Sequence, residues 1–381
     1  MMNDLILTNA HIVLDDSVIR GTLHIRDGRI AHVDTSQTQT AGAIDCEGDY
    51  LIPGLIELHT DNLEKHLMPR AGVIWPSLPA VLTHDAQVVA AGITTVFDAL
   101  SVGDLEEESV RIETLRSTYD AILDGQRSGA LRADHWIHLR CELAYPRLLE
   151  ALEPLLDHDS VRLMSLMDHT PGQRQYRDIQ QYRKYYSKHH ASWTEEQFAD
   201  VVERRLQQQQ TYSDKHERAV LDLLSDRQVI LASHDDTELA HVEHAHGIGI
   251  TICEFPTTAE AATAAHQRGM STVMGAPNVV RGGSHSGNVA ALDLARLDRL
   301  DMLSSDYVPA SLLHGAFMLH SEAGWSMPRA IATVTANPAR ALELSDRGAL
   351  AEGLRGDVVR MKVINDLPII RQVWVEGVRG F

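Results

Sequence analysis

Apolar and polar residues alternate near both ends of the chain, and this pattern predicts short antiparallel β-strands. Turn-favouring pairs such as Asp27-Gly28 separate the alternating segments. These segments are 5–7, 11–14, 22–25 and 29–33 near the amino terminus, and 358–363 and 371–377 near the carboxyl terminus. Either end alone would leave an open sheet edge and no core. We therefore predict that residues 1–52 and 345–381 pair into one small β-sandwich domain.

The pattern changes between these ends to apolar strands that alternate with helical stretches. Several of the strands are near-continuous apolar runs, as in sheets that are buried on both faces. The eight predicted strands are 51–58, 93–99, 135–143, 161–167, 228–233, 248–253, 271–275 and 300–305. Helical periodicity is clear at 85–91, 258–268 and 328–342. Eight such units predict an α/β fold, a (β/α)8 TIM-like barrel over residues 53–344.

An open, doubly wound sheet is the alternative architecture for the same alternation. Such a sheet usually has a glycine-rich phosphate-binding turn after its first strand. Here Gly54 has no other glycine beside it. This absence favours the closed barrel.

One segment, at about 171–215, departs from the regular spacing of the strands. It contains several arginines and tyrosines and a glutamine run at 207–210. We predict a long helical insertion near the mouth of the barrel, where such segments often act as lids. A solvated helical hairpin without a role explains the same composition, and both interpretations stay open.

The composition limits the function. The chain has 381 residues, enough to bury a large core, and its 44% hydrophobic and 23% charged residues are ordinary for a globular protein. Its three cysteines show no metal-binding or disulfide spacing, so we expect a cytoplasmic protein. No apolar run approaches the ~20 residues that a membrane span needs. The net charge of −19 excludes an ordinary nucleic-acid binder.

The first predicted strand ends with two residues that can bind metal. His59 and Asp61 are two positions apart, so on a strand their side chains point to the same side. An imidazole and a carboxylate placed in this way can share a divalent ion. The pair alone is a weak signal, because this spacing is common by chance.

The signal strengthens because metal-ligand types recur at the ends of other strands, and a barrel has its active site at those carboxyl ends. Without a cation such groups would repel one another. The six candidate ligands are His59, Asp61, Glu142, His169, His234 and Asp306. Six ligands suit two ions that share Glu142, and a single ion is the alternative. Zinc is the first candidate, and manganese or iron fit the same ligands. Asp306 is the candidate base that orients or deprotonates the attacking water.

These residues resemble the amidohydrolase superfamily. The resemblance lies in residues 53–59, in Asp306 and in the split β domain, and it covers essentially the whole chain. Glu142 resembles the bridging glutamate of its sugar-deacetylase branch. Three positions depart from the usual pattern: Asp61 stands where a second histidine is usual, His169 where a carboxylated lysine is frequent, and Glu254 where a ligand histidine is frequent.

Longer runs resemble one phosphorus-directed branch of that superfamily more closely. These runs are 57–66, 69–76, 167–175 and 275–288. The branch belongs to phosphonate catabolism by the carbon–phosphorus lyase pathway. The resemblance implies hydrolysis of a phosphorylated sugar phosphonate, from the 5-triphosphate to the 5-phosphate with release of pyrophosphate. The same departures occur in that branch, so they count against an amide hydrolase rather than against catalysis.

Such a substrate carries several negative charges, and the sequence offers cations near the strand ends. Glycines at 282, 283 and 287 would let backbone N–H groups approach phosphate oxygens. The candidate substrate-binding residues are Lys65, Arg70, Arg174, Arg281 and His285, and the candidates for supporting the ligands from behind are Asn62, Glu64 and Glu254. We also expect a homo-oligomer. A cyclic-amide hydrolase of the same superfamily and a non-catalytic assembly relative are the alternative functions.

Overall fold

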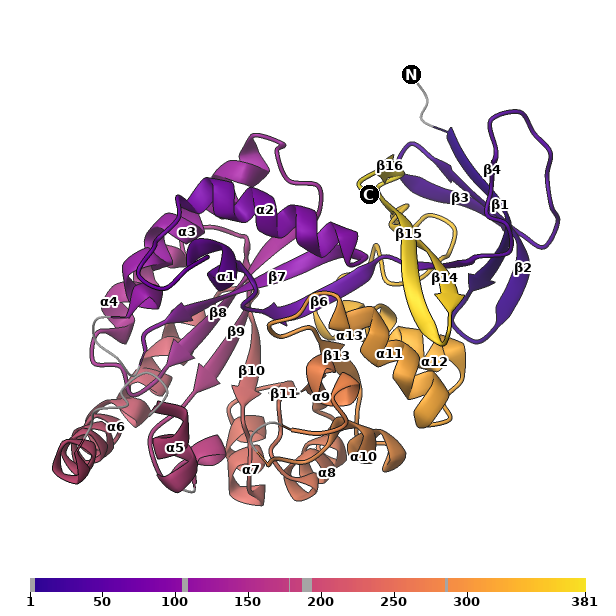
Figure 1. The fold of residues 1–381 in the computed structure, drawn as a ribbon. Coiled ribbons are helices and arrows are strands. Elements are labelled where there is room, and N and C mark those ends of the chain that lie inside the picture. Colours follow the sequence, from indigo (N-terminus) through magenta and orange to yellow (C-terminus); the bar gives the residue numbers. More distant parts are fainter. Residues whose placement is uncertain (1–3, 105–108, 178, 187–193, 285–286) are drawn as a thin grey trace.

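The computed structural model describes residues 4–104, 109–177, 179–186, 194–284 and 287–381, and it contains two sheets (Figure 1). One is an all-parallel sheet of eight strands in the order β13-β12-β11-β10-β9-β8-β7-β6, which curls into a nearly closed barrel. Its strands are β6 (Leu55–Thr60), β7 (Ile93–Val102), β8 (Asp134–Glu142), β9 (Val161–Met167), β10 (Ile230–His234), β11 (Ile252–Glu254), β12 (Ser271–Gly275) and β13 (Met302–Ser304). The predicted barrel is confirmed.

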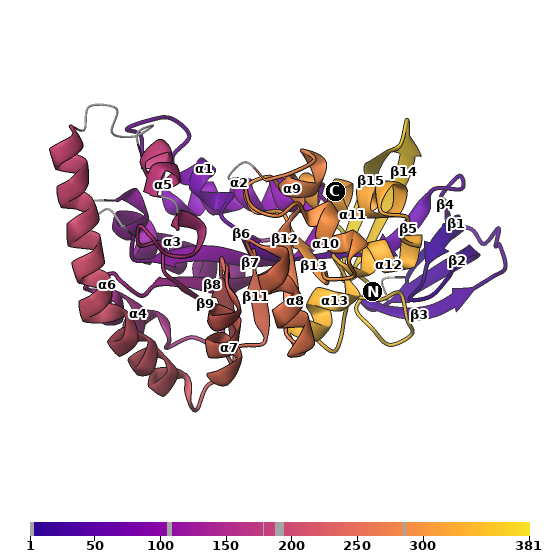
Figure 2. The same cartoon turned by 90° about the horizontal axis from the view of Figure 1, so that it is seen from below.

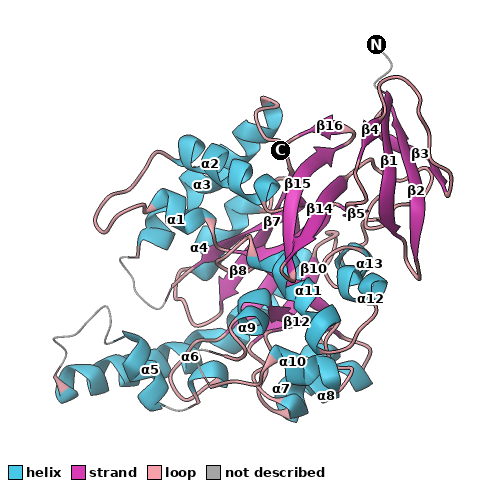
Figure 3. Ribbon diagram, turned by 45° about the vertical axis from the view of Figure 1, so that its right-hand side comes forward, coloured by secondary structure: helices cyan, strands magenta, loops and turns pink. Residues whose placement is uncertain are grey.

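Helices connect consecutive strands and cover the outside of the barrel (Figure 3). They are α1 (Leu63–Leu67), α2 (Ser77–Ala90), α3 (Val110–Arg127), α4 (Leu148–Leu152), α5 (Ile179–Tyr186), α6 (Glu195–Leu224), α7 (Leu239–Gly247), α8 (Ala259–Gln267), α9 (Ala276–Val280), α10 (Ala291–Arg296), α11 (Ser311–Glu322), α12 (Met327–Ala332) and α13 (Ala336–Ala341), with short 3-10 turns at Glu153–Leu155 and Arg174–Tyr176. Within the described residues, no helix is both long enough and apolar enough to cross a membrane.

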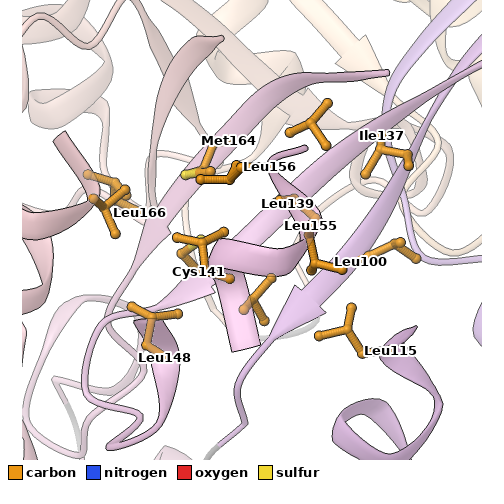
Figure 4. Close-up of a cluster of buried hydrophobic side chains, with 14 of the residues drawn as sticks. Leu100, Leu115, Ile137, Leu139, Cys141, Leu148, Leu155, Leu156, Met164 and Leu166 are labelled. Carbon is orange, nitrogen blue, oxygen red and sulfur yellow. The ribbon is translucent and has the colours of Figure 1, made fainter. Parts of the chain in front are cut away.

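Apolar side chains fill both sides of the barrel wall. Figure 4 shows part of the outer layer, where Leu139 and Cys141 of β8 belong to the same buried cluster as Leu148 of α4. A second cluster takes side chains from β6, β7 and β9 to β13. Because these strands lie all around the ring, this second cluster is the inner core of the barrel. Burial at about 25 cal/mol per Å² makes these layers the main stabilising term.

The barrel closes at a seam between its first and last strands, β6 and β13. At the upper end of the seam, Thr60 bridges to Asp306, the second residue after β13. In the middle, the carboxylate of Glu57 accepts the backbone N–H groups of His59 (2.7 Å) and Ser305 (2.6 Å). Glu57 is fully buried. One side chain therefore joins the two strands that no continuous ladder connects.

The lower end of the seam is closed by the backbone between α12 and α13. The carbonyl of Thr333 accepts from the N–H of Leu303, and the carbonyl of Val334 accepts from the N–H of Ile56. The single helix predicted over 328–342 is therefore wrong. These two carbonyls bond to the strands instead of to the next helical turn, so the helix breaks there.

The terminal segments form the second, mixed sheet, so the two ends of the chain pair as predicted. Its main order is β16-β15-β14-β5-β1-β2-β3, with β4 paired to β1. The strands are β1 (Asp4–Val13), β2 (Val18–Arg26), β3 (Arg29–Asp34), β4 (Ile44–Asp45), β5 (Tyr50–Pro53), β14 (Val358–Ile364), β15 (Leu367–Val375) and β16 (Val378–Arg379). The antiparallel pairing of β5 with β14 joins the two ends of the chain. The sheet stands at one end of the molecule, opposite α6 (Figure 2).

The predicted insertion forms the two helices α5 and α6, and α6 extends beyond the expected end to Leu224. Thr194 caps α6 by accepting from the N–H of Gln197, whose side chain bonds back to the N–H of Thr194. Gln209 in the middle of α6 reaches Asp168 after β9 (3.2 Å). The helix is thus attached to the strand ends at its centre.

A buried polar network lies between α2 and the strands β7 and β8. Asp98 accepts from His84 (2.8 Å) and His135 (2.7 Å), and both rings are fully buried. Asp85 bonds to Arg132 (2.8 Å) and lies 3.4 Å from the second nitrogen of His135. Burial disfavours the charged ring, but the carboxylates of Asp98 and Asp85 more than offset it and raise the pKa of His135 to about 9.

We expect the Glu57→Gln variant to be less stable than the wild type by about 1–3 kcal/mol at about pH 8. An amide offers one acceptor oxygen where the carboxylate offers two, so one backbone N–H of the seam loses its partner. Urea denaturation measures the difference. Glu203→Gln, on the exposed face of α6, is the matched control and should change stability by less than about 0.5 kcal/mol. Equal midpoints for the two variants would contradict the role of Glu57.

The stabilising effect of His135 should depend on pH. Because its folded pKa of about 9 lies above the ordinary value of 6.5, its contribution is complete below about pH 6.5 and is lost as the pH rises through 9. We expect the stability difference between the wild type and His135→Asn to shrink by on the order of 3 kcal/mol between pH 6.5 and pH 10. Chemical denaturation over this range measures it. A difference that stays constant would show that His135 is neutral in the folded state.

Candidate functional site

All six predicted metal ligands line one cavity of about 270 Å³ at the carboxyl ends of the barrel strands. They come from five different strands and from the turns that follow them. His59 is the fifth residue of β6, Glu142 ends β8 and His234 ends β10, whereas Asp61, His169 and Asp306 lie one or two residues past β6, β9 and β13. The closed ring brings together residues that are up to about 250 positions apart in the sequence.

Glu254 holds two of the histidines from behind. Its two carboxylate oxygens lie 3.1 Å from Nδ1 of His59 and 3.4 Å from Nδ1 of His234. The hydroxyl of Ser165 donates to the same carboxylate at 2.5 Å. Burial opposes ionisation of Glu254, but the neighbouring histidines, first His59 and then His138, more than offset it, so its pKa lies well below the ordinary value. An ionised Glu254 fixes Nδ1 of both rings as the donor, which leaves Nε2 of each free to bind a metal.

Glu142 holds His169 in a similar way. One oxygen of Glu142 lies 2.7 Å from Nδ1 of His169, and the other accepts the backbone N–H of His169 at 3.2 Å. Burial lowers the pKa of His169, but the charge of Glu142 outweighs it and the pKa is raised. Glu142, expected to bridge two ions, has both oxygens directed at His169 in this arrangement.

Asp235 is a candidate metal ligand that the sequence reasoning missed. Its Oδ2 atom is fully buried and has no hydrogen-bond partner in the described part of the chain. That atom lies 3.7 Å from Nε2 of His169 and 3.7 Å from Nε2 of His234. Burial raises the pKa of Asp235 to about 6, an energetic cost that a cation at this point would remove. The three atoms form a donor set that fits a divalent ion.

The reason for missing Asp235 is local. It follows His234 directly, and residues i and i+1 of a strand point to opposite sides. However, Asp235 has a left-handed backbone (φ 56°), which turns its side chain back toward the cavity. The adjacent Asp236 binds Arg174 and the hydroxyl of Ser233 instead. Only the His-Asp-Asp run at 234–236 could have suggested a further ligand.

Asp61 and Asp306 meet across the seam. The backbone carbonyl of Asp306 accepts from the hydroxyl of Thr60 (2.7 Å) and from the N–H of Asp61 (3.2 Å). Asp306 also has a left-handed backbone, with φ 54°. Burial, and then the nearby carboxylate of Asp61, raise the pKa of Asp306 to about 6. A carboxyl group with this pKa can exchange a proton near neutral pH.

The predicted substrate-binding cations are only partly in place. Arg281 lies on the cavity wall, and His285 falls outside the described residues. The other three predicted cations are not among the described residues that line the cavity. Lys65 bonds to the carbonyl of Tyr307, Arg70 is exposed, and Arg174 donates to Asp236 and to the carbonyl of His234.

Two other arginines, which the sequence reasoning did not single out, do line the cavity. Arg111 of α3 pairs with Glu64 at 2.8 Å, so Glu64 supports the wall rather than a ligand. Arg140 of β8 is two residues before Glu142, and its Nη1 lies 3.8 Å from the carboxylate of Asp61. The alternation of a strand, which pointed to His59 and Asp61, would have found Arg140 as well.

The remaining supporting candidate, Asn62, links the site to the buried network behind β7. Its amide donates to Gln87 (2.9 Å) and lies 3.1 Å from Nδ1 of His84. The His84, Asp98 and His135 cluster also has the residue types of a metal site. It lies off the cavity wall, and each oxygen of Asp98 is already hydrogen-bonded, so hydrogen bonding accounts for it.

Comparisons with known proteins agree with this geometry. The chain is 45% identical over 379 residues to "Alpha-D-ribose 1-methylphosphonate 5-triphosphate diphosphatase" from Escherichia coli (strain K12), which covers 99% of this chain and 100% of that protein. No family model matches the chain.

Solved structures share the fold at low identity. An N-acetyl-D-glucosamine-6-phosphate deacetylase mutant from Mycobacterium smegmatis has a TM-score of 0.65 at 16% identity, over 99% of both chains. A 5-methylcytosine deaminase from Klebsiella pneumoniae has a TM-score of 0.64 at 17% identity, over 98% of this chain and 97% of that chain. At these identities the likenesses show a shared fold alone.

We expect Asp235→Asn to weaken metal binding by at least about tenfold, because the variant loses a charged oxygen that faces two histidines. Metal content after dialysis against a graded chelator, measured by atomic emission, tests this. Asp226→Asn, exposed after α6, is the control and should bind like the wild type. Unchanged metal retention by Asp235→Asn would remove Asp235 from the site.

Proposed function

Because the chain belongs to the alpha-D-ribose 1-methylphosphonate 5-triphosphate diphosphatase family, we propose that it hydrolyses this triphosphate to the 5-phosphate and pyrophosphate. The observation that carries the proposal is the full-length relationship, 45% identity over 99% of the chain. The cavity supports it, because ligand-type side chains and arginines share one wall. The proposed reaction is a step in the catabolism of phosphonates.

The residues of the cavity fit divalent metal. We propose that one ion is held by His169, His234 and Asp235, whose facing atoms lie within 4.8 Å of one another and include a buried oxygen without a partner among the described residues. His59, Asp61 and Asp306 are the ligands proposed for a second ion. Bound divalent ions supply positive charge that polarises phosphoryl oxygens and lowers the pKa of nearby water. Zinc is the ion to test first, then manganese and iron.

Two carboxylates have a supporting role in this proposal. Glu254 keeps Nδ1 of His59 and His234 protonated, and Glu142 does the same for His169. This is the usual arrangement in which a carboxylate orients a ligand histidine and makes it a better donor. The alternative that Glu254 itself binds an ion is less well supported, because Glu254 is fully buried and lies behind the cavity wall.

Asp306 is proposed to take the proton from the attacking water. Its carbonyl is fixed by Thr60 and Asp61, and its side chain lies on the cavity wall. The water oxygen forms a bond to the phosphorus nearest the ribose. The bond from that phosphorus to the bridging oxygen breaks, and its electron pair leaves with pyrophosphate. The proton passes to Asp306, whose pKa, raised to about 6 by burial and then by Asp61, suits a general base.

The far end of the triphosphate requires donors at the rim of the cavity. Arg281 lies there, exposed, after the short helix α9, and Asn278 and Gly283 line the same side. Gly283 has a φ of 153°, a backbone conformation that allows its N–H to approach a ligand closely. Arg174 acts indirectly in this proposal, because it fixes Asp236 and the carbonyl of His234.

The cavity also bears on the two alternative functions. A cyclic amide is neutral and gains little from three arginines on the wall. A non-catalytic assembly relative has no reason to keep all six ligand-type residues around one cavity. Both alternatives are therefore less favoured than phosphoryl hydrolysis.

We expect phosphorus NMR of the metal-loaded protein to show pyrophosphate released from the phosphonate triphosphate. In water enriched in ¹⁸O, the label should enter the sugar 5-phosphate, because the proposed attack is on the phosphorus nearest the ribose. A nucleoside triphosphate and a dihydropyrimidine are tested separately as alternative substrates. Opening of the ring amide, without release of pyrophosphate, would overturn the proposed function.

In the same assay, Asp306→Asn should reduce kcat by about 10²–10⁴-fold, as expected for loss of a general base. Its metal content is measured in parallel. Near-normal turnover with full metal content would show that Asp306 is not the base. Asp226→Asn is again the control variant.

A further inference from the structure

Among the described arginines, Arg140 has two buried guanidinium nitrogens without a hydrogen-bond partner, whereas Arg162 and Arg205 have one each. The side chain of Arg140 is 10% exposed, and it lies on the cavity wall beside the ligand-type residues. Its Nε and Nη1 atoms are fully buried and make no hydrogen bond to any described residue. The nearest carboxylate oxygen, in Asp61, is 3.8 Å from Nη1, which is too far for a hydrogen bond.

Two other arginines show how such a group is usually paired in the described structure. Arg360 in the second sheet is similarly buried, and it donates to Asp49 at 2.6 Å and to the carbonyl of Cys46 at 3.1 Å. Arg111, on the same cavity wall, is paired with Glu64 at 2.8 Å. A buried donor without a partner costs about 1–3 kcal/mol, and more when it is charged. The fold therefore leaves two charged donors of Arg140 without partners, at a cost to stability.

The position of Arg140 is set by the strand. Arg140 and Glu142 alternate along β8, so both side chains face the cavity, and the barrel wall holds the backbone of Arg140 in place. Its positive charge acts on the acidic groups at the centre of the site. Burial and Asp61 raise the pKa of Asp306, and Arg140 is among the groups that oppose this rise. Burial also raises the pKa of Asp235, again against the charge of Arg140.

We propose that Arg140 donates its Nε–H and Nη1–H groups to the non-bridging oxygens of the phosphoryl group that is attacked. This inference rests on the proposed function and adds a residue to it. A guanidinium fork binds two oxygens of one phosphoryl group at once, which a lysine cannot do. Arg140 lies beside Asp61, and its charge acts on Asp306, the proposed base. We therefore place the phosphoryl group nearest the ribose at Arg140. Arg281, at the rim, is left for the far end of the triphosphate.

The chemical consequence is greatest in the transition state. While water adds to phosphorus and the bond to pyrophosphate breaks, negative charge accumulates on the non-bridging oxygens. Donors that are already fixed and desolvated stabilise that charge without reorganisation. Removing Arg140 should therefore lower kcat more than it raises KM.

The test compares Arg140→Gln and Arg140→Lys with a matched control, Arg162→Gln. Arg162 lies on the adjacent strand β9, stacks on Trp136 at 5.3 Å and also has a buried Nε without a partner in the described structure, but it lies off the cavity wall. We expect Arg140→Gln to lose about 10²–10³-fold in kcat with unchanged metal content. Arg140→Lys should recover only part of this loss, and Arg162→Gln should match the wild type. Added guanidinium ion should partly restore Arg140→Ala.

A second measurement is independent of turnover. Binding of ribose 5-phosphate, which carries the phosphoryl group nearest the ribose, to the metal-loaded protein, followed by calorimetry, should weaken by at least about tenfold in Arg140→Gln and stay unchanged in Arg162→Gln. If the wild type binds ribose 5-phosphate through Arg140 but does not hydrolyse the phosphonate triphosphate, the proposed function fails while the contact of Arg140 with this phosphoryl group stands. Loss of metal in proportion to activity, unaltered kcat and binding, or no binding of ribose 5-phosphate by the wild type would each overturn the role of Arg140.

Discussion

The carboxylate of Glu57 is the contact on which the site depends, because it closes the barrel. It binds the backbone of β6 and the backbone just after β13 at the same time. Without this closure, Asp61 and Asp306 would lie on opposite edges of an open sheet. The closed ring instead places them side by side, so the first and last strands contribute to one cavity. Ring closure and assembly of the site are therefore the same event.

Acidic side chains outnumber basic ones around the cavity, and they differ in how their charge is compensated. Glu254 behind the wall and Glu142 on the wall are hydrogen-bonded to histidines, which offset their charge. On the wall, Asp235 and Asp306 stay uncompensated, and burial raises both of their pKa values to about 6. Such a site is poised to accept cations first and an anionic substrate afterwards. The overall charge of −19 makes this order necessary, because the protein alone repels an anion.

Sequence periodicity was enough to predict the barrel and the placement of six ligand-type residues around one cavity, because both follow from where an apolar strand stops. The prediction failed where the direction of a side chain depends on the local backbone conformation. Asp235 is aimed by a left-handed residue, which no alternation rule contains. The cations Lys65 and Arg174 were predicted from their position after a strand, yet their side chains bind the carbonyls of Tyr307 and His234 and the carboxylate of Asp236. Arg140 faces the cavity by the same strand alternation as Glu142. It was passed over because arginine is not a metal ligand.

The pairing of β5 with β14 has a consequence for synthesis of the chain. Roughly 300 residues separate these two strands, so the ribosome must make the whole barrel before the second sheet can be completed. Until then, β5 presents an unpaired edge, and Leu7 and Leu51 lack the cover of Trp374. Contacts this distant in sequence form slowly. The nascent amino-terminal strands are therefore the part of the protein that most needs protection from aggregation during translation.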